Sequence, residues 1–190
     1  HYADIEGCEK LVSDAIRDHY LPVGSNNVVP KQPLSIVLAL SDKIDYLTSL
    51  WQIGIKPTGN KDPFALRRTS LGIIRIILEN KLDVDLDYLI DLTTVNFDMS
   101  DLQLFLKERI INYLTEKNYQ KKVVEAVVKQ YKLDFLPILP RVIAEITEFI
   151  SSEPGVRFLA VYKRVFNLLS SNKALISSKK KFSKECATED

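Results

Sequence analysis

The sequence contains little cysteine, histidine and glycine. Its 190 residues include two cysteines, two histidines and six glycines. Cys8 and Cys186 lie near opposite ends of the chain, outside any Cys-x-x-Cys or Cys/His cluster, which excludes a disulfide framework and a zinc site of the usual spacing. We therefore expect one buried or half-buried thiol and one thiol in a tail, both in a reducing compartment.

Long hydrophobic runs and an excess of charge of one sign are also missing. No stretch reaches the roughly 18 apolar residues of a membrane span, so no membrane partner is expected. Lys and Arg total 26 against 25 Asp and Glu. Because dedicated nucleic-acid-binding domains are usually clearly basic, any contact with RNA has to come from local patches. The chain starts at His1 without a signal peptide, and we expect it to be a piece of a longer protein.

Helical periodicity runs through almost the whole sequence. Hydrophobic residues make up 46% of the chain, enough for a core without disulfides or metal. They recur at helical spacing in segments separated by proline, glycine and aspartate. The β-branched stretch at residues 123–128 is flanked by Lys and Glu at helical spacing, so it is predicted to be a helix. The sequence predicts an all-α fold.

Proline, glycine and aspartate predict where the helices begin and end. Pro33 suits the first turn of a helix that Gly54 would end. Asp62 followed by Pro63 has the pattern of an N-cap and a first helical residue. The helix after it is apolar nearly all round beyond Ser70, and it is expected to be the most buried one. Further helix starts are expected at Asp85, Ser100 and Asp134, and a break at residues 153–155.

The first and the last helix are expected to be amphipathic. Apolar residues follow one face of each: Cys8, Leu11, Val12, Ala15, Ile16 and His19 in the first, and Phe158, Tyr162, Val165 and Leu169 in the last. After Ser170 the chain turns polar. The run of lysines at residues 179–181 is predicted to belong to a frayed basic tail.

Several stretches resemble one family. Residues 18–22 (DHYLP) and 38–47 (LALSDKIDYL) are similar to "HYLP" and "ALADKLDTL" in the glycyl-tRNA synthetase beta subunit. Residues 53–68 (IGIKPTGNKDPFALRR) match the family pattern "IGxxPTGSKDPFALRR", and a match of that length at the same spacing is highly specific. Residues 158–169 resemble "LaaANKRVsNIL" more weakly, and they depart from it at residues 160–162, where Ala-Val-Tyr stands in place of "AAN".

The resemblance implies that the chain is an internal fragment of a bacterial-type beta subunit. Residues 1–95 would form the C-terminal part of a multi-helical HD-like domain. Residues 96–153 would form a helical connecting segment. Residues 154–190 would be the truncated start of an anticodon-binding domain, followed by the polar tail.

The family resemblance also implies a function. Two alpha and two beta subunits join glycine to tRNA-Gly at the expense of ATP, and the beta subunit supplies tRNA recognition. The alpha subunit holds the catalytic core with its ATP and Mg²⁺. We therefore expect no catalytic residue, cofactor or metal site in this fragment, which would not be catalytic alone. Its expected partners are tRNA-Gly and the alpha subunit, and its expected location is the cytoplasm.

Basic side chains are the candidate contacts with RNA or with the other subunit. Six are singled out: Lys56, Lys61, Arg67, Arg68, Lys163 and Arg164. The first four cluster on a loop and the start of a helix, where free N–H groups and the helix dipole suit a phosphate. The last two lie on the final helix. In the structural alternative, the arginines pair with carboxylates such as Asp42 or Asp45, and the last helix presents a solvated face.

Two other functions remain open from the sequence. The middle region of the family resembles HD phosphohydrolases, and residues 39–45 look like the helix that carries the last metal-binding Asp of that fold. Such a site needs a cluster of His and Asp ligands, whereas this chain has only His1 and His19 and no His-Asp dipeptide. The third possibility is a helical interaction scaffold without RNA contact. Composition alone does not separate the three.

Overall fold

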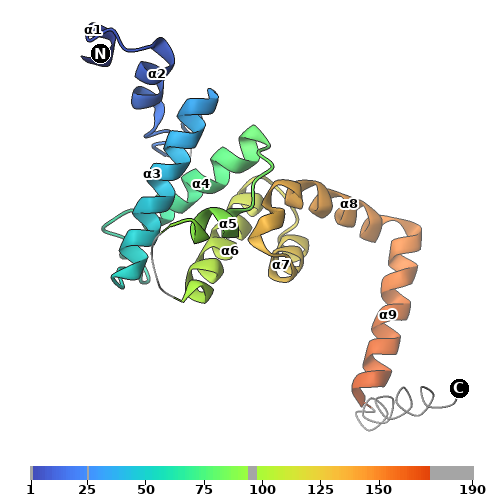
Figure 1. The fold of residues 1–190 in the computed structure, drawn as a ribbon. Helices are drawn as coiled ribbons and strands as arrows, with labels where there is room; N and C mark the ends of the chain where they lie inside the picture. Colours follow the sequence, from blue (N-terminus) through green and yellow to red (C-terminus); the bar gives the residue numbers. More distant parts are fainter. Residues whose placement is uncertain (1, 25, 94–97, 172–190) are drawn as a thin grey trace, which may run out of the picture. The chain divides into compact units, whose positions relative to one another are not determined.

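The computed structural model describes residues 2–24, 26–93 and 98–171, without the side chains of residues 134, 135 and 171 (Figure 1). Within these ranges the regular structure is helical, and Thr58 and Lys61 form one isolated β-bridge. The all-α prediction is confirmed. None of the helices described is long and apolar enough to cross a membrane. Two compact units are present, residues 1–143 and 144–190. The predicted division at residues 95 and 153 stays a prediction.

The first unit is a set of packed helices. Its elements are α1 (Tyr2–Ile5), α2 (Lys10–Asp18), α3 (Pro33–Gln52), α4 (Leu66–Asn80), α5 (Leu86–Asp91), α6 (Met99–Glu116), α7 (Lys121–Gln130), the 3₁₀-helix η1 (Leu133–Ile138) and the start of α8 (Leu139–Ser151). The long α3 packs against α2 and α4, while α6 packs against α4 and α7 (Figure 1). Helix α4 therefore lies between α3 and α6.

Helix α4 is the central helix, as its sequence predicts. Residues 72–77 are buried without interruption, and Ile74, Ile76 and Ile77 have no exposed surface. A helix is buried on all sides only where neighbours cover it on several sides, here α3, α6 and η1. The same run contains Arg75, whose buried guanidinium requires polar partners inside the protein.

Several helix ends lie where the sequence predicts them. Pro33 occupies the first turn of α3, and Gly54 follows its end with a φ of 80°, a backbone conformation that favours glycine. The Asp85 side chain caps α5 by accepting a hydrogen bond from the N–H of Tyr88. Residues 121–130 form α7, so the prediction of a helix for the valine-rich stretch is confirmed.

The predicted start of α4 was wrong. The helix begins at Leu66, three residues after Pro63, because Ala65 adopts a left-handed conformation with a φ of 54° and interrupts the helical path. Asp62 still caps the helix, but from outside it. Its carboxylate accepts hydrogen bonds from the N–H groups of Leu66 and Arg67 at 2.9 and 3.0 Å.

Two further helix starts also differ from the prediction. Asp98, rather than Ser100, caps α6 by accepting a hydrogen bond of 2.9 Å from the N–H of Ser100. An aspartate there competes well with serine for the cap position. The helix expected from Asp134 is a 3₁₀-helix containing Pro137, and α8 begins only at Leu139. Proline lacks the N–H that a continuous α-helix would need at this point.

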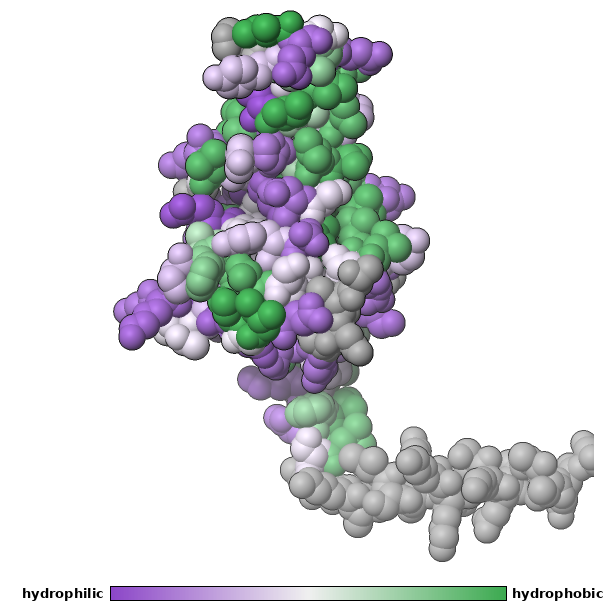
Figure 2. Space-filling model, turned by 60° about the vertical axis from the view of Figure 1, so that its left-hand side comes forward, coloured by the Kyte–Doolittle hydropathy of each residue, from purple (hydrophilic) through white to green (hydrophobic). Residues whose placement is uncertain are grey.

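The apolar face of α2 is mostly at the surface. Ala15 is buried, whereas Leu11, Val12 and Ile16 are between 38% and 53% exposed. Figure 2 shows apolar side chains at the surface of the part of the first unit that α1 and α2 form. Cys8 is exposed, so the expectation of a buried or half-buried thiol was wrong. It precedes α2 and does not share the helix face; Cys186 lies outside the described residues.

The second unit holds most of α8 and all of α9 (Glu153–Ser171). The predicted break is confirmed, since α8 ends at Ser151 and α9 begins two residues later. Phe149 packs edge-on against Phe158, which stacks with Tyr162 at a centroid distance of 6.3 Å. Phe158 and Tyr162 are nevertheless both 57% exposed. The lysines at residues 179–181 lie outside the described residues.

Candidate functional site

The loop between α3 and α4 is held by its own backbone. Thr58 and Lys61 exchange two backbone hydrogen bonds of 3.0 and 2.8 Å. The Asp62 carboxylate then occupies the first N–H groups of α4. It also places a negative charge at the positive end of the helix dipole. The expectation that free N–H groups at this helix start would receive a phosphate was therefore wrong for the two groups that Asp62 binds.

Two of the four loop cations have partners within the protein. The Lys56 Nζ donates a hydrogen bond of 2.7 Å to Asp101 on α6, and it lies 5.4 Å from the centre of the Trp51 ring. The Arg67 Nη2 donates a hydrogen bond of 2.6 Å to the carbonyl oxygen of Gly59. These contacts tie the loop to α6 and to itself. Both residues therefore have a structural role. The structural alternative expected the arginines to pair with carboxylates, whereas Arg67 donates to a backbone carbonyl oxygen.

The other two loop cations are available to a ligand. Lys61 and Arg68 are exposed, and their side chains make no hydrogen bond or ion pair with any residue that the structure describes. Asp42 lines the same pocket as Arg68, but no ion pair joins them within the described ranges. Lys61 and Arg68 therefore keep their charge free for an external anion.

Arg68 borders two pockets. One, of about 420 Å³, has a polar side formed by Asp42, Lys43 and Tyr46. The other, of about 240 Å³, lies between α4 and α6 and is lined by Arg67, Arg68, Leu71, Arg109, Asn112, Tyr113 and Glu116. Arg109 was missed by the sequence analysis. It lies in the middle of α6, and only the packing of α6 on α4 brings it beside the two arginines of the motif.

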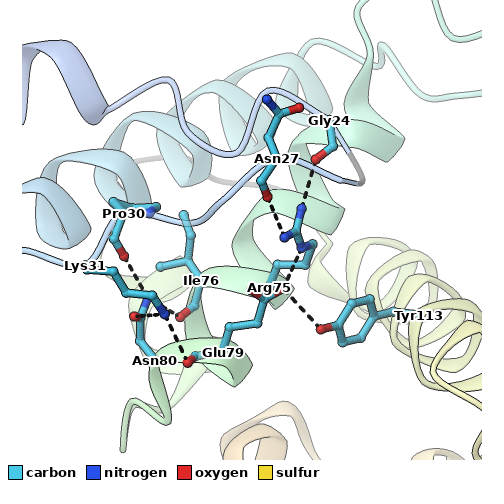
Figure 3. Close-up of polar contacts among 9 residues, drawn as sticks. All are labelled: Gly24, Asn27, Pro30, Lys31, Arg75, Ile76, Glu79, Asn80 and Tyr113. Carbon is cyan, nitrogen blue, oxygen red and sulfur yellow. Dashed lines mark hydrogen bonds and ion pairs between the residues drawn. The ribbon is translucent and has the colours of Figure 1, made fainter.

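Tyr113, which lines this second pocket, belongs to a part-buried polar network that ties α6 to α4 (Figure 3). The guanidinium of Arg75 donates hydrogen bonds to the carbonyl oxygens of Gly24 and Asn27 at 2.9 and 2.6 Å. Its Nε donates to the Glu79 carboxylate at 2.7 Å, and the Tyr113 hydroxyl donates to the same oxygen at 3.3 Å. Burial raises the pKa of Tyr113, and the adjacent Glu79 charge acts in the same direction. The network joins α4, α6 and the loop after α2.

Two further contacts hold the loops around α3 and α4. The Lys43 Nζ is buried and donates a hydrogen bond of 2.8 Å to the carbonyl oxygen of His19, at the end of α2. Burial lowers the pKa of Lys43, and the charge of Asp42 partly opposes this change. Asn80 donates to the carbonyl oxygen of Pro30 and accepts from Lys31 (Figure 3). These bonds make the segment between α2 and α3 part of the packed unit.

The carboxylates of α3 do not form a metal-binding cluster. Asp42 and Asp45 are exposed, whereas the two residues between them, Lys43 and Ile44, are buried. Across residues 2–24, 26–93 and 98–171, no group of three or more His, Cys, Asp or Glu residues is arranged to hold a metal ion. No feature of the described residues favours the phosphohydrolase alternative.

The remaining two candidate cations lie in the second unit. Lys163 and Arg164 are on α9, and both are exposed. Neither makes an ion pair or a side-chain hydrogen bond to another described residue. Because the two compact units are separate, these cations have to be tested apart from those around α4.

Comparison with known proteins gives a consistent result. Residues 1–129 match the family described as glycyl-tRNA synthetase beta subunit. The chain is 38% identical over 170 residues to the glycine–tRNA ligase beta subunit of Ruegeria sp. (strain TM1040), covering 90% of this chain and 25% of that protein. The same subunit of Phenylobacterium zucineum (strain HLK1) is 39% identical over 89% of this chain and 24% of its own length. The chain thus spans about a quarter of these curated relatives.

Proposed function

Because this chain belongs to the glycyl-tRNA synthetase beta-subunit family, we propose that it helps a beta subunit to recognise and position tRNA-Gly. In this proposal the alpha subunit is the partner that carries out the ATP-dependent joining of glycine to the tRNA. The 190-residue piece contributes no reacting group. Its six candidate contacts remain Lys56, Lys61, Arg67, Arg68, Lys163 and Arg164.

The observation that carries the proposal is the free charge at the start of α4. Lys61 and Arg68 are exposed and make no ion pair with a described residue, so binding an anion there would break no internal contact. Arginine and lysine that neutralise phosphates release counterions, which supplies much of the affinity of proteins for nucleic acids. The balanced composition of the chain does not oppose this proposal. The electrostatic part of the binding free energy depends on how many phosphates are contacted, and a few local cations are enough to contact them.

The fold suits a positioning role. The motif that carries these cations continues into the buried α4, and the Asp62 cap and the bond from Lys56 to Asp101 fix the loop on α4 and α6. Cations on a rigid support lose less conformational entropy when a ligand binds. Correct placement of a substrate can supply several kcal/mol of an activation barrier without contact to the reacting atoms. The proposed contribution to aminoacylation is of this kind.

The test is binding of the purified 190-residue chain to tRNA-Gly across a series of salt concentrations. The double variant Lys61→Ala/Arg68→Ala is expected to bind more weakly. It should also reduce the slope of log K against log salt by about 1 for each phosphate that is no longer neutralised. Lys163→Ala/Arg164→Ala measures the contribution of the second unit in the same way.

The matched control is Lys122→Ala/Lys129→Ala, which removes two exposed cations from α7 that line none of the pockets described above. It has the same net charge as the double variants, so an effect of overall charge would appear in it equally. Circular dichroism checks that each variant keeps its helices. Absence of binding by the wild-type chain, or equal losses in all three variants, would contradict the proposal.

A further inference from the structure

We propose that the pocket between α4 and α6 binds a phosphate group and that Arg109 is one of its ligands. The inference rests on the proposed function for the source of that group, a phosphodiester of tRNA. The pocket of about 240 Å³ brings together Arg67, Arg68 and Arg109, and Glu116 is the acidic residue among its described lining residues. Nothing in the family motif points to Arg109, because it lies on α6.

The environment of Arg109 indicates that its guanidinium lacks a good acceptor within the protein. Its side chain is 22% exposed, and its Nε is buried without a hydrogen-bond partner among the described residues. Its Nη2 lies 3.6 Å from the Glu108 carboxylate, which is too long for a good hydrogen bond. A buried donor that stays unpaired is costly, and more so when it is charged. Such a group requires an explanation, and a bound anion that supplies the missing acceptor is one.

Besides its ion pair with the exposed Glu108, Arg109 is held by neighbours on α6. The guanidinium carbon lies 5.6 Å from the centre of the Phe105 ring, one helical turn earlier on α6. The next turn carries Tyr113, which lines the pocket and is hydrogen-bonded to Glu79 in the Arg75 network. Figure 3 shows Tyr113 reaching this network from its own helix. The pocket wall that carries Arg109 is therefore fixed to α4 before any ligand arrives.

The opposite wall supplies one free and one partly engaged arginine. Arg68 makes no hydrogen bond or ion pair to a residue described by the structure. Arg67 uses one nitrogen for the Gly59 carbonyl oxygen, and its other N–H groups make no hydrogen bond to a described residue. Asn112 adds an exposed amide at the rim. Glu116 also lines the pocket, but it makes no ion pair with these arginines in the part of the chain described.

The chemistry of these donors selects the ligand. A guanidinium presents two parallel N–H groups that match two oxygens of a phosphate, and three guanidiniums around one small pocket suit a compact group with several anionic oxygens. A phosphodiester of tRNA and free inorganic phosphate share this chemistry. An acidic side chain of a neighbouring protein has only two oxygens and would leave one guanidinium without a full partner.

The experiment combines binding with a direct probe of Arg109 in the purified chain. Arg109→Gln is expected to weaken tRNA-Gly binding and to lower the salt slope by about 1, whereas Arg109→Lys keeps the charge and should recover part of the slope. Arg17→Gln, an exposed arginine on α2, is the control for the loss of one charge. In the wild-type chain, the NMR signal of the Arg109 Nε–H is followed while inorganic phosphate replaces chloride at constant ionic strength.

The outcomes separate this inference from the proposed function. A shift of the Arg109 signal together with weaker tRNA binding by Arg109→Gln supports a phosphodiester site. A shift without any change in tRNA binding supports a site for free phosphate. If tRNA binds and responds to Lys61→Ala/Arg68→Ala, while Arg109→Gln behaves like Arg17→Gln and the NMR signal does not move, the pocket is not a phosphate site although the proposed function stands. If Arg109→Gln does not fold, the titration of the wild-type chain decides alone.

Discussion

Arg75 on α4 donates a hydrogen bond of 2.6 Å to the carbonyl oxygen of Asn27, which lies 48 residues earlier in the chain. The same guanidinium binds Gly24 and Glu79, and only 6% of the residue is exposed. A buried charge is tolerated when its N–H groups are all directed at acceptors. At this one position of the central helix α4, hydrogen bonds from Arg75 to the loop after α2 take the place of apolar packing.

Replacement of Arg75 by leucine is expected to destabilise the first unit by about 3–5 kcal/mol, because two backbone carbonyls lose their donor and the Glu79 carboxylate loses its cation and keeps only the bond from Tyr113. Urea unfolding followed by circular dichroism measures this loss. Arg17→Leu is the control, since its side chain is 65% exposed and surface ion pairs contribute little to stability. Equal losses of unfolding free energy in the two variants would show that the Arg75 network does not stabilise the first unit.

The cap of α4 gives a second prediction. Asp62→Ala removes the acceptor for the N–H groups of Leu66 and Arg67 and should cost about 1 kcal/mol of unfolding free energy. Asp62→Asn keeps an acceptor oxygen and should lose only part of that amount. Asp45→Ala, an exposed carboxylate within α3, is the control and should change stability by less than about 0.5 kcal/mol. Because Leu66 and Arg67 donate to different oxygens, a loss in Asp62→Asn as large as that in Asp62→Ala would mean that one uncharged acceptor oxygen does not stabilise the helix start.

The sequence predicts well those features of the fold that are determined by residues close to each other in the chain. The burial of residues 72–77 follows from an apolar composition on all sides of one helix, and the end of α3 follows from a glycine that adopts a positive φ at low cost. The start of α4 was misplaced because Ala65, which carries no sequence signal for it, takes the left-handed conformation. The role of Asp62 as a cap survives this shift, since its side chain can reach the helix from outside.

The candidate site was only half predictable for a similar reason. Lys61 and Arg68 stand in a recognisable motif, and whether their charges are free depends on which carboxylates the fold brings close. Arg109 enters the pocket through the packing of α6 on α4, a contact between segments far apart in the sequence. No pattern of residues around Arg109 distinguishes it from an arginine on a solvated helix face. Only the folded chain shows that its Nε is buried without a hydrogen-bond partner among the described residues.

The corner between α8 and α9 gives a third prediction. A β-carbon at Gly155 would collide with the carbonyl group of Phe149, and backbone atoms cannot move aside as a flexible side chain can. Gly155→Ala should therefore open the corner and remove protection from hydrogen exchange at residue 155 and at Val156, whose amides bond to Ser152. Amides of α4 in the same sample serve as the internal control. Unchanged protection at the corner would show that the helices can rearrange around the added methyl group.

The last prediction concerns Lys43, whose ammonium group is buried against the carbonyl oxygen of His19. Burial lowers the pKa of Lys43 in the folded chain below its ordinary value of 10.5, and Asp42 offsets only part of this change. Below the folded pKa the lysine is protonated in both states, so the folded state bears the full cost of the buried charge. As the pH rises from the folded pKa towards 10.5, the unfolded chain binds more protons than the folded chain, and stability attributable to Lys43 increases.

Lys43→Met keeps the length of the side chain and removes its titration. The unfolding free energy of the wild-type chain minus that of Lys43→Met is therefore expected to grow as the pH is raised from neutrality to about 10. Other groups, including Tyr113, titrate in both proteins, so their contributions largely cancel in the difference. Urea unfolding of the two proteins at matched pH values measures it. If this free-energy difference stays constant with pH, water reaches the ammonium group. If it shrinks as the pH rises, the fold favours the charged form of Lys43 through its bond to His19.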